Sequence, residues 1–469
     1  MSLPVIAAVV TAFSALVLYL WSRRKSSTDP PILKGWVPWL GCAVEFGKAP
    51  LWFIQKAKCK LGPLFTIYVT GKRLTFVTEQ EDFKHFFQSP NVDFQQAVQQ
   101  PVKNTASVKE ESFFQYHTKI HDTVKGRLAP SKLGLISQQL SKGFLEQLNK
   151  SERSGQSIDL NDFIRNVMYA AVLNHLFGKG VMPTDTKEGL RELTVNFVEY
   201  DDEFEYGSQL PELFLKQWAK SKHWLLNLFR NIVKKLDTEQ RSSGEDETLL
   251  QTLIASVDRP HAPNYGLLLM WASLANAIPI SFWTVAFILS EEGCLEKAKK
   301  EIKEALGSPG SLPSDAEIPE ETLLKMPYIK QCIMEAIRLR SPGVITRKVV
   351  KPIPIRNYII PAGDHIMLSP YWAHRNTQFF PDPERFYPER WDKADLEKNV
   401  FLEGFVAFGG GRYQCPGRWF ALMEIHIFIA LLLHKFDMKL VSNVPNLSPL
   451  HLVGTQQPVG KCLVDYKMY

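Results

Sequence analysis

The pattern of apolar and polar positions predicts a mainly helical protein with small sheets. From about residue 79 to residue 345, apolar side chains recur at three- and four-residue spacing, which is typical of amphipathic helices. Two β-branched and aromatic runs between residues 64 and 78 flank Thr70-Gly71-Lys72-Arg73 and predict a β-hairpin, because Gly71 can supply the positive φ of a tight turn. The proline-rich residues 349–361 predict short extended pieces, and the apolar residues 416–436 predict a buried core helix.

The N-terminal segment predicts a membrane anchor. Residues 3–21 carry no charged side chain, and as a helix they span about 28 Å, close to the ~30 Å hydrocarbon layer of a bilayer. Arg23, Arg24 and Lys25 follow at once, and the positive-inside rule places them on the cytosolic side. A cleaved signal peptide would carry its charge before a shorter apolar core, so an uncleaved anchor is favoured. We expect an anchor with its basic stop over residues 1–25, a linker over 26–33 and one large domain over 34–469.

Composition and charge set limits rather than indicate a function. Of the 469 residues, 45% are hydrophobic and 22% are charged, as in ordinary globular proteins. The 55 Lys+Arg against 49 Asp+Glu give a net charge of +6, which is spread too thinly to predict a nucleic-acid partner. The cysteines form no CxxC pair and are too sparse for a disulfide framework, which favours reduced thiols in a cytosolic domain. They are Cys42, Cys59, Cys294, Cys332, Cys415 and Cys462.

The densest chemical signal is FGGGRYQCPG, at residues 408–417. Its three glycines permit a backbone path that brings main chain close to a flat ligand. Cys415 precedes Pro416 and the apolar helix, so a thiolate there would lie at the positive end of a helix dipole and accept backbone N–H bonds. That setting suits an axial ligand of haem iron. The alternatives are a small buried hydrophobe and a phosphate cradle, although the Lys-Ser/Thr pair or preceding strand of a cradle is missing from this sequence.

This segment resembles the haem-binding loop of the cytochrome P450 family, whose pattern is F-x-x-G-x-R-x-C-x-G. The matching residues are Phe408, Gly411, Cys415 and Gly417. The resemblance implies that Cys415 is the axial ligand of haem b iron, with Phe408, Gly411 and Arg412 in the haem-binding loop. Tyr413 stands where the family has an arginine, and Arg412 lies one position earlier, so one propionate contact departs from the family pattern.

Two more segments are similar to motifs of the family. Glu335 and Arg338 resemble the ExxR helix motif, a spacing that is also common for surface ion pairs. Arg390, in DPERFYPERW, resembles part of the family's second conserved segment. The resemblance implies a Glu335–Arg338–Arg390 cluster that locks the loop presenting Cys415, since such a network is stronger than an isolated pair.

Basic residues near these motifs have alternative roles. Arg347 falls where the family places a cationic contact to a haem propionate, but with Lys348 and Lys351 it could also form a solvated basic face. The resemblance implies docking of a separate reductase on a basic surface near Cys415, with Lys348, Lys351 and Arg412 as candidates.

The apolar residues 264–290 resemble the family's helix across the distal haem face. Ala275 and Asn276 fall where the family usually has an acid and a threonine. Asn276 is therefore predicted to hydrogen-bond bound oxygen, a water or a substrate hydroxyl, and the alternative is a satisfied core asparagine. Pro279 is expected to kink the helix or free a carbonyl.

An asparagine with a nearby proline in this helix is similar to the family branch that holds sterol 7α-hydroxylases and prostacyclin synthase. Strings such as KGWVPWLG from Lys34, EFEYGSQLPE from Glu203 and LHLVG from Leu450 resemble the oxysterol 7α-hydroxylases of that branch. The resemblance implies a cytochrome P450 fold over residues 34–469 and a membrane-bound haem-thiolate monooxygenase of sterol and bile acid metabolism. Its expected substrate is an oxysterol, 24-hydroxycholesterol, hydroxylated at the 7α position.

The same resemblance implies O2 and NADPH as co-substrates, with electrons supplied by a separate NADPH-cytochrome P450 reductase. The expected location is the endoplasmic reticulum membrane, crossed once, with the catalytic domain in the cytosol. Two alternatives stay open: a haem-thiolate isomerase acting on a lipid peroxide, and a non-catalytic membrane-tethered lipid-binding protein.

Overall fold

The computed structural model describes residues 11–16, 28–35, 37, 39–151, 157–238, 247–396, 398 and 400–469. Within the expected anchor, residues 11–16 are helical and expose Phe13 and Leu16, while the rest of residues 1–25 lies outside the described residues. The chain divides into two compact units, Met1–Val98 with Val344–Ala373, and Gln99–Gly343 with His374–Tyr469. The expected arrangement of anchor, linker and one large domain stays a prediction.

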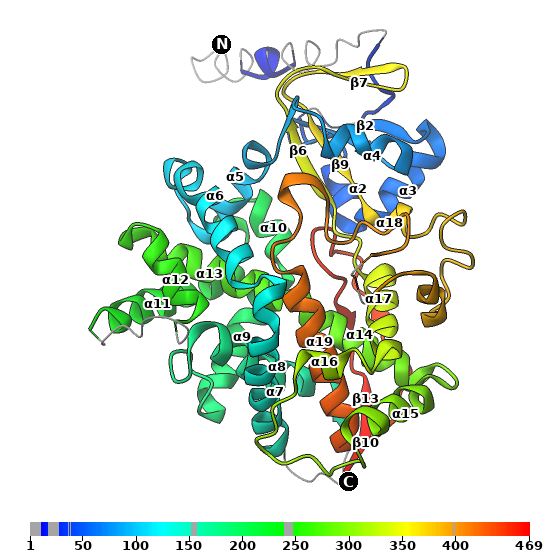
Figure 1. Ribbon diagram of the computed structural model, residues 1–469. Helices are drawn as coiled ribbons and strands as arrows, with labels where there is room; N and C mark the ends of the chain where they lie inside the picture. The colour runs from blue at the N-terminus through cyan, green and yellow to red at the C-terminus, as the bar shows by residue number, and fades with distance from the viewer. Residues whose placement is uncertain are drawn as a thin grey trace. The chain divides into compact units, whose positions relative to one another are not determined.

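The first unit is built on a six-stranded sheet in the order β1-β2-β3-β9-β6-β4, beside a small hairpin of β7 and β8 (Figure 1). Its strands are β1 (Ile32–Leu33), β2 (Leu64–Val69), β3 (Lys72–Val77), β4 (Val92–Asp93), β6 (Ile345–Val349), β7 (Ile353–Ile355), β8 (Tyr358–Ile360) and β9 (His365–Leu368). Its helices are α2 (Ala43–Lys48), α3 (Pro50–Leu61), η1 (Gln80–Asp82), α4 (Phe83–Phe87) and α18 (Pro370–Ala373), and α5 (Phe94–Ala106) begins in it.

The predicted hairpin is confirmed as β2 and β3, which pair antiparallel from Leu64 with Val77 to Val69 with Lys72. The turn is shorter than expected and consists of Thr70 (φ 48°) and Gly71 (φ 78°). Positive φ at both central residues is the geometry of a two-residue turn that matches the twist of the strands. The hairpin thereby supplies the second and third strands of the sheet, with β1 pairing on the β2 side and β9 on the β3 side.

The residues that follow the expected anchor are bound to strands of the first unit from Thr28 onward. The Thr28 carbonyl accepts a hydrogen bond of 2.8 Å from Ile359 N–H. Asp29 lies 3.4 Å from Arg73 Nη2, and Arg73 Nε lies 2.9 Å from Asp364. Because Asp364 and Arg73 are shielded from water, this ion-pair network ties residue 29 firmly to strand β3.

The second unit is mainly helical (Figure 1). Its longer helices are α6 (Glu110–Arg127), α7 (Leu133–Asn149), α8 (Leu160–Phe177), α9 (Lys187–Asp202), α11 (Lys216–Thr238), α12 (Leu249–Ser256), α13 (Ala262–Leu274), α14 (Ala277–Ser290), α15 (Cys294–Leu306), α17 (Pro327–Arg340) and α19 (Arg418–Lys435). Short helices are η2 (Pro130–Lys132), α10 (Phe204–Gln209), η3 (Glu212–Phe214), η5 (Arg259–His261), α16 (Glu320–Leu323), η6 (Pro388–Lys393) and η7 (Gly411–Tyr413). Its strands are β5 (Ile158–Asp159), β10 (Phe436–Leu440), β11 (Asn446–Leu447), β12 (Pro458–Val459) and β13 (Leu463–Met468).

Helix α19 forms the centre of this unit and is the core helix predicted from residues 416–436. Every residue from Leu422 to His434 is buried, and the helix packs against α7, α14, α15 and α17. This near-uniform burial explains why the segment is apolar on all sides rather than on one face. The Cys415 loop therefore leads directly into a helix that is buried along most of its length.

The expected distal helix is interrupted where Pro279 predicts a break. Helix α13 ends at Leu274 and α14 begins at Ala277, with Ala275 and Asn276 in a turn between them. Pro279 has no N–H to donate to the Ala275 carbonyl, which is four residues earlier. The missing bond opens the helix at this point, and Asn276 is exposed although its neighbours Ala275 and Ala277 are buried.

Candidate functional site

The segment around Cys415 forms a compact loop that turns back on itself before α19. Gly409 (φ 70°) and Gly411 (φ 66°) take left-handed conformations that favour glycine. The Cys415 N–H donates to the Phe408 carbonyl at 2.9 Å, and the Gly409 N–H donates to the Val406 carbonyl at 3.0 Å. Two of the three glycines therefore take conformations that other residues rarely adopt, and a hydrogen bond between residues 408 and 415 closes the loop. The close approach of main chain to a flat ligand stays a prediction.

Cys415 is presented outward by this loop rather than packed into the core. Its side chain is exposed, whereas Cys42, Cys294, Cys332 and Cys462 are buried. The alternative of a small buried hydrophobe therefore does not describe Cys415. Its neighbours Phe408 and Arg412 lie on the same loop, where the Arg412 guanidinium rests 5.6 Å from the centre of the Tyr413 ring.

The surroundings of the Cys415 sulfur suit a metal-bound thiolate. Protein atoms crowd around the exposed side chain, and this desolvation raises the pKa of the thiol above its ordinary value of 9.0. The backbone N–H groups of Gly417 and Arg418 and the charge of Arg418 act in the opposite direction. Helix α19 begins at Arg418, two residues later than the Pro416 start implied by the sequence, because Gly417 is its N-cap. A thiolate at this position would therefore depend on an added positive charge, such as that of a bound metal ion.

Tyr413, which replaces the family's arginine, lies beside two histidines of helix α6. Its ring centre is 6.1 Å from that of His117 and 6.4 Å from that of His121. The three side chains come from two segments that are far apart in sequence, and each offers a polar atom at the edge of an aromatic ring. The exposed Cys415 sulfur, the glycine path and this polar group fit a flat ligand with acidic substituents, which describes haem.

Glu335, Arg338 and Arg390 form the cluster expected from the sequence. Arg338 Nη2 and Arg390 Nε lie 2.7 and 2.9 Å from Glu335 Oε1, and Tyr387 N–H donates to the same oxygen at 3.1 Å. Arg338 Nε and Trp391 Nε1 donate to Oε2 at 2.9 and 3.0 Å. Glu335 and Arg338 are fully buried, so one carboxylate satisfies five donors away from water.

The outer nitrogens of the two arginines hold the chain that follows α18. Arg338 Nη1 donates to the carbonyls of His374 and Pro383 at 2.8 and 2.7 Å. Arg390 Nη1 donates to the Pro381 carbonyl at 2.9 Å. The cluster therefore fixes residues 374–391 as one body, which fits the structural role that the family resemblance implies.

Arg347 lies in the first unit, on β6, and is buried at 4% exposure. Its guanidinium is 4.9 Å from the ring centre of Phe86 and 4.8 Å from that of Phe94. Two aromatic faces thus hold the charge, and cation–π attraction stabilises it. The alternative of a solvated basic face does not describe Arg347. Its contact to a haem propionate stays a prediction, since Cys415 belongs to the second unit.

Asn276 is fixed by the C-terminal segment that follows β11. The N–H and Oγ1 of Thr455 lie 3.0 and 3.3 Å from its Oδ1. Because a backbone N–H can only donate, the atom facing Thr455 must be the amide oxygen. The amide nitrogen is therefore directed elsewhere, on a side chain that is exposed. That Asn276 hydrogen-bonds bound oxygen, a water or a substrate hydroxyl stays a prediction, and the group it would offer is a donor.

Two groups that were not expected from the sequence also shape the second unit. Glu205, in α10, accepts hydrogen bonds from the backbone N–H groups of Leu452 and Val453. His374 bridges α17 and the Cys415 loop, donating to the Arg338 carbonyl and accepting from Val406 N–H. Neither residue stands in a spacing that predicts burial, although His374 lies only eight residues before the recognised segment DPERFYPERW.

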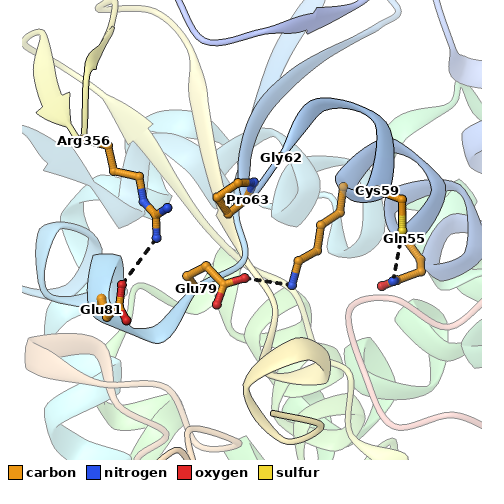
Figure 2. Close-up of a pocket in the computed structure, with 8 residues that line it drawn as sticks. Gln55, Cys59, Gly62, Pro63, Glu79, Glu81 and Arg356 are labelled. Atoms are coloured by element: carbon orange, nitrogen blue, oxygen red, sulfur yellow. Dashed lines mark hydrogen bonds and ion pairs between the residues drawn. The ribbon is translucent and has the colours of Figure 1, made fainter. Parts of the chain in front are cut away.

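A pocket of about 410 Å³ in the first unit does not contain any of these groups. Figure 2 shows Arg356, Glu79 and Glu81 around it, and the charges are paired, Lys58 with Glu79 at 3.0 Å and Arg356 with Glu81 at 3.6 Å. Because its charges neutralise one another and it is wide open, this pocket offers no candidate for chemistry.

A comparison with known protein families identifies the family of this chain. Residues 30–464 match the cytochrome P450 family. The chain belongs to this family. A P450 binds haem and carries out oxygen-dependent monooxygenation, so the chain is a P450 monooxygenase, and the alternative of a non-catalytic lipid-binding protein is excluded.

Several relatives resemble this P450 over nearly its whole length. It is 46% identical to mouse 24-hydroxycholesterol 7-alpha-hydroxylase over 98% of this chain and 97% of the relative. It is 45% identical to the human protein of that name, over 98% of both chains. Rat cytochrome P450 7A1 is 26% identical over 95% of both.

Among solved structures, retinoic acid-bound cyanobacterial CYP120A1 has a TM-score of 0.73 at 20% identity and covers 95% of this chain. This likeness confirms the predicted P450 fold.

Proposed function

We propose that this P450 hydroxylates an oxysterol at the 7α position, with 24-hydroxycholesterol as its substrate. The observation that carries the proposal is the 46% identity, over 98% of the chain, to a protein named 24-hydroxycholesterol 7-alpha-hydroxylase. The identity to rat cytochrome P450 7A1 is much lower, at 26%. We therefore take the proposed substrate from the name of the more similar relatives, the 24-hydroxycholesterol 7-alpha-hydroxylases.

Haem b would be held through Cys415, with Phe408, Gly411 and Arg412 in the loop around it and Arg347 at a propionate. Haem bound through a cysteine thiolate supplies the oxygen-activating chemistry, since the thiolate pushes electron density that favours O–O cleavage. The N–H groups of Gly417 and Arg418 stabilise the negative charge on sulfur. The five-donor cluster around Glu335 keeps residues 374–391 in place while the loop carries that charge.

Asn276 is the polar residue proposed for the distal side. Thr455 holds its amide oxygen at 3.0 Å, so the amide nitrogen is presented as a hydrogen-bond donor in a fixed direction. An oxygen of the substrate or of a water can accept from it. An asparagine cannot pass on a proton as an acid does, so its role is to orient and polarise rather than to titrate.

Electrons would come from NADPH through a separate reductase that docks on a basic surface, with Lys348, Lys351 and Arg412 as candidates. The apolar residues 3–21 and the basic stop that follows support a single-pass location in the endoplasmic reticulum membrane, with the catalytic unit in the cytosol. Two helical stretches within the described residues are long and apolar enough to span a bilayer, residues 259–290 and 411–435. Both are mostly buried, which is the property of core helices.

Product analysis tests the substrate. The full-length protein is supplied with NADPH, reductase and a panel of side-chain hydroxylated cholesterols, and we expect the 24-hydroxy compound to give the 7α product at the highest kcat/KM. Equal rates on cholesterol, or no sterol turnover, would refute the substrate. Conversion of a lipid peroxide without NADPH or reductase would establish the isomerase alternative instead.

Replacement of Cys415 tests the ligand. Cys415→Ser is expected to abolish the red-shifted thiolate band of the reduced protein with carbon monoxide. Cys59→Ser, at the other exposed cysteine, is the matched control and keeps the full band. A variant Cys415→Ser that retained the band would show that another residue binds the iron.

A further inference from the structure

His374 lies between the Glu335 cluster and the Cys415 loop and contacts both. Its ring is fully buried, and both ring nitrogens are engaged. Nδ1 lies 3.2 Å from the Arg338 carbonyl, and Nε2 lies 3.1 Å from Val406 N. A carbonyl can only accept and a backbone N–H can only donate, so the proton must be on Nδ1 and Nε2 must be bare.

This neutral form is held over the whole physiological range. Burial, together with the charges of Arg338 and Arg375, lowers the pKa of His374 to about 3. His374 therefore acts as a fixed donor and acceptor pair rather than as a titrating group.

On one side, His374 is locked to the Glu335 cluster. Arg338 Nη1 donates to the His374 carbonyl at 2.8 Å, while the His374 ring donates to the Arg338 carbonyl. The two residues thus bind each other in both directions. Since Arg338 also binds Glu335 through two nitrogens, the position of the His374 ring is set by the cluster.

On the other side, a short series of backbone hydrogen bonds leads to Cys415. Val406, which donates to His374, accepts from Gly409 N–H at 3.0 Å, and Phe408 accepts from Cys415 N–H at 2.9 Å. The His374 ring also stacks on Phe405, with ring centres 5.0 Å apart and an angle of 10° between the planes. The imidazole therefore contacts this segment in two ways, through the hydrogen bond at Nε2 and through the stacked Phe405 ring.

We propose that His374 is the positioning residue that sets where the Cys415 loop begins relative to the Glu335 cluster. The two ring hydrogen bonds of His374 join Arg338 of the cluster to Val406 of the loop, so the histidine is a polar link between them. This inference rests on the proposed role of Cys415 as iron ligand.

Two variants separate the two halves of the link. In His374→Asn the amide reaches the position of Nδ1, so the donor to Arg338 is kept and the acceptor for Val406 N–H is lost. In His374→Gln the amide reaches the position of Nε2, so the acceptor for Val406 is kept and the ring donor to Arg338 is lost. Arg338 Nη1 still binds the carbonyl of residue 374 in this variant, so the link to the cluster is kept through the main chain. Phe405→Leu is the matched control, because it removes the stacked ring and leaves both hydrogen bonds.

The readouts are the thiolate band of the reduced protein with carbon monoxide and amide hydrogen exchange of the loop. His374→Asn is expected to convert to the form without the band about tenfold faster than wild type, as for the loss of one hydrogen bond of about 1.4 kcal/mol. The amides of Val406, Gly409 and Cys415 are expected to exchange about tenfold faster in the same variant. His374→Gln and Phe405→Leu should stay within about threefold of wild type in both measurements.

The outcomes separate this inference from the proposed function. Equal behaviour of His374→Asn and His374→Gln in both measurements would overturn the positioning role. A wild-type protein without the thiolate band would overturn the ligand role of Cys415 instead. Because hydrogen exchange is measured on the folded chain whatever its haem content, a variant that binds haem poorly still gives an answer.

Discussion

The Glu335 cluster makes a quantitative prediction about stability. Replacing Glu335 with glutamine keeps the shape of the side chain but turns one carboxylate oxygen into an NH2 group, which cannot accept. The three donors at Oε1 favour keeping oxygen there, so the NH2 group would face Arg338 Nε and Trp391 Nε1. The variant therefore loses two hydrogen bonds and leaves two buried guanidinium groups without their counter-charge.

The size of the effect follows from these contacts. Each hydrogen bond to a charged group contributes about 1.5–3 kcal/mol, and breaking a buried ion pair by removing one partner costs about 3–5 kcal/mol. We expect Glu335→Gln to lower the free energy of unfolding by about 4 kcal/mol, a large part of the total stability of about 5–15 kcal/mol of a natural domain. At a urea dependence of about 3 kcal/mol/M, the unfolding midpoint falls by more than about 1 M.

Urea titration followed by far-UV circular dichroism measures this midpoint, at a fixed haem concentration because bound haem adds stability. Glu384→Gln is the control, since Glu384 also pairs with an arginine, Arg375, at 2.8 Å, but its side chain is 70% exposed. An exposed pair contributes less than about 1 kcal/mol, so this control should shift the midpoint by less than about 0.3 M. Equal shifts for the two variants would refute the argument that burial gives the Glu335 cluster its strength.

Two further predictions concern pH and the distal side. Burial, with the nearby charge of Asp201, raises the pKa of Glu205 from 4.5 to about 7. A carboxyl that holds its proton more tightly when folded stabilises the protein below about pH 4.5, and this contribution is lost as the pH rises through about 7. Glu205→Gln keeps an oxygen for the amides of Leu452 and Val453, so its free energy of unfolding, from urea titration, should match wild type at pH 5 and exceed it by about 2–3 kcal/mol at pH 8. Equal pH slopes would contradict this. Asn276→Asp keeps an acceptor for Thr455 but loses the donor, and its kcat should fall about tenfold or more with an unchanged thiolate band. Thr455→Val, which keeps the backbone bond, should stay within about threefold.

The parts of the site that could be predicted from sequence are those in which chemistry and spacing are local. Cys415 follows its glycines within a few residues, and Glu335 and Arg338 lie one helical turn apart. Gly71 marks its hairpin in the same way. Arg390 was found only through the family resemblance, because its partner is 55 residues away.

The remaining groups could not be predicted because distant segments give them their environment. Glu205 lies in an acidic stretch that resembles a solvated surface, and it is buried by residues almost 250 positions later. The direction of the Asn276 amide is set by Thr455, 179 residues away. His374 has an ordinary polar sequence around it, and its role depends on Val406 and Arg338 meeting at its two nitrogens.

The pairing of β5 with β13 has a consequence for how the chain is made. Val464 pairs with Ile158 and Leu463 with Asp159. Strand β5 therefore cannot pair until β13, about 300 residues later, has been synthesised. Helix α7 likewise cannot pack against α19, and Glu335 cannot accept from Arg390 and Trp391, until those later residues have been synthesised. Helix α8 follows α7 closely and covers part of its surface, but at about 5–20 residues per second the part that packs on α19 stays uncovered for about 14 seconds or longer. The part of the α7 surface that α19 covers in the folded unit therefore stays open for that time while the chain is made.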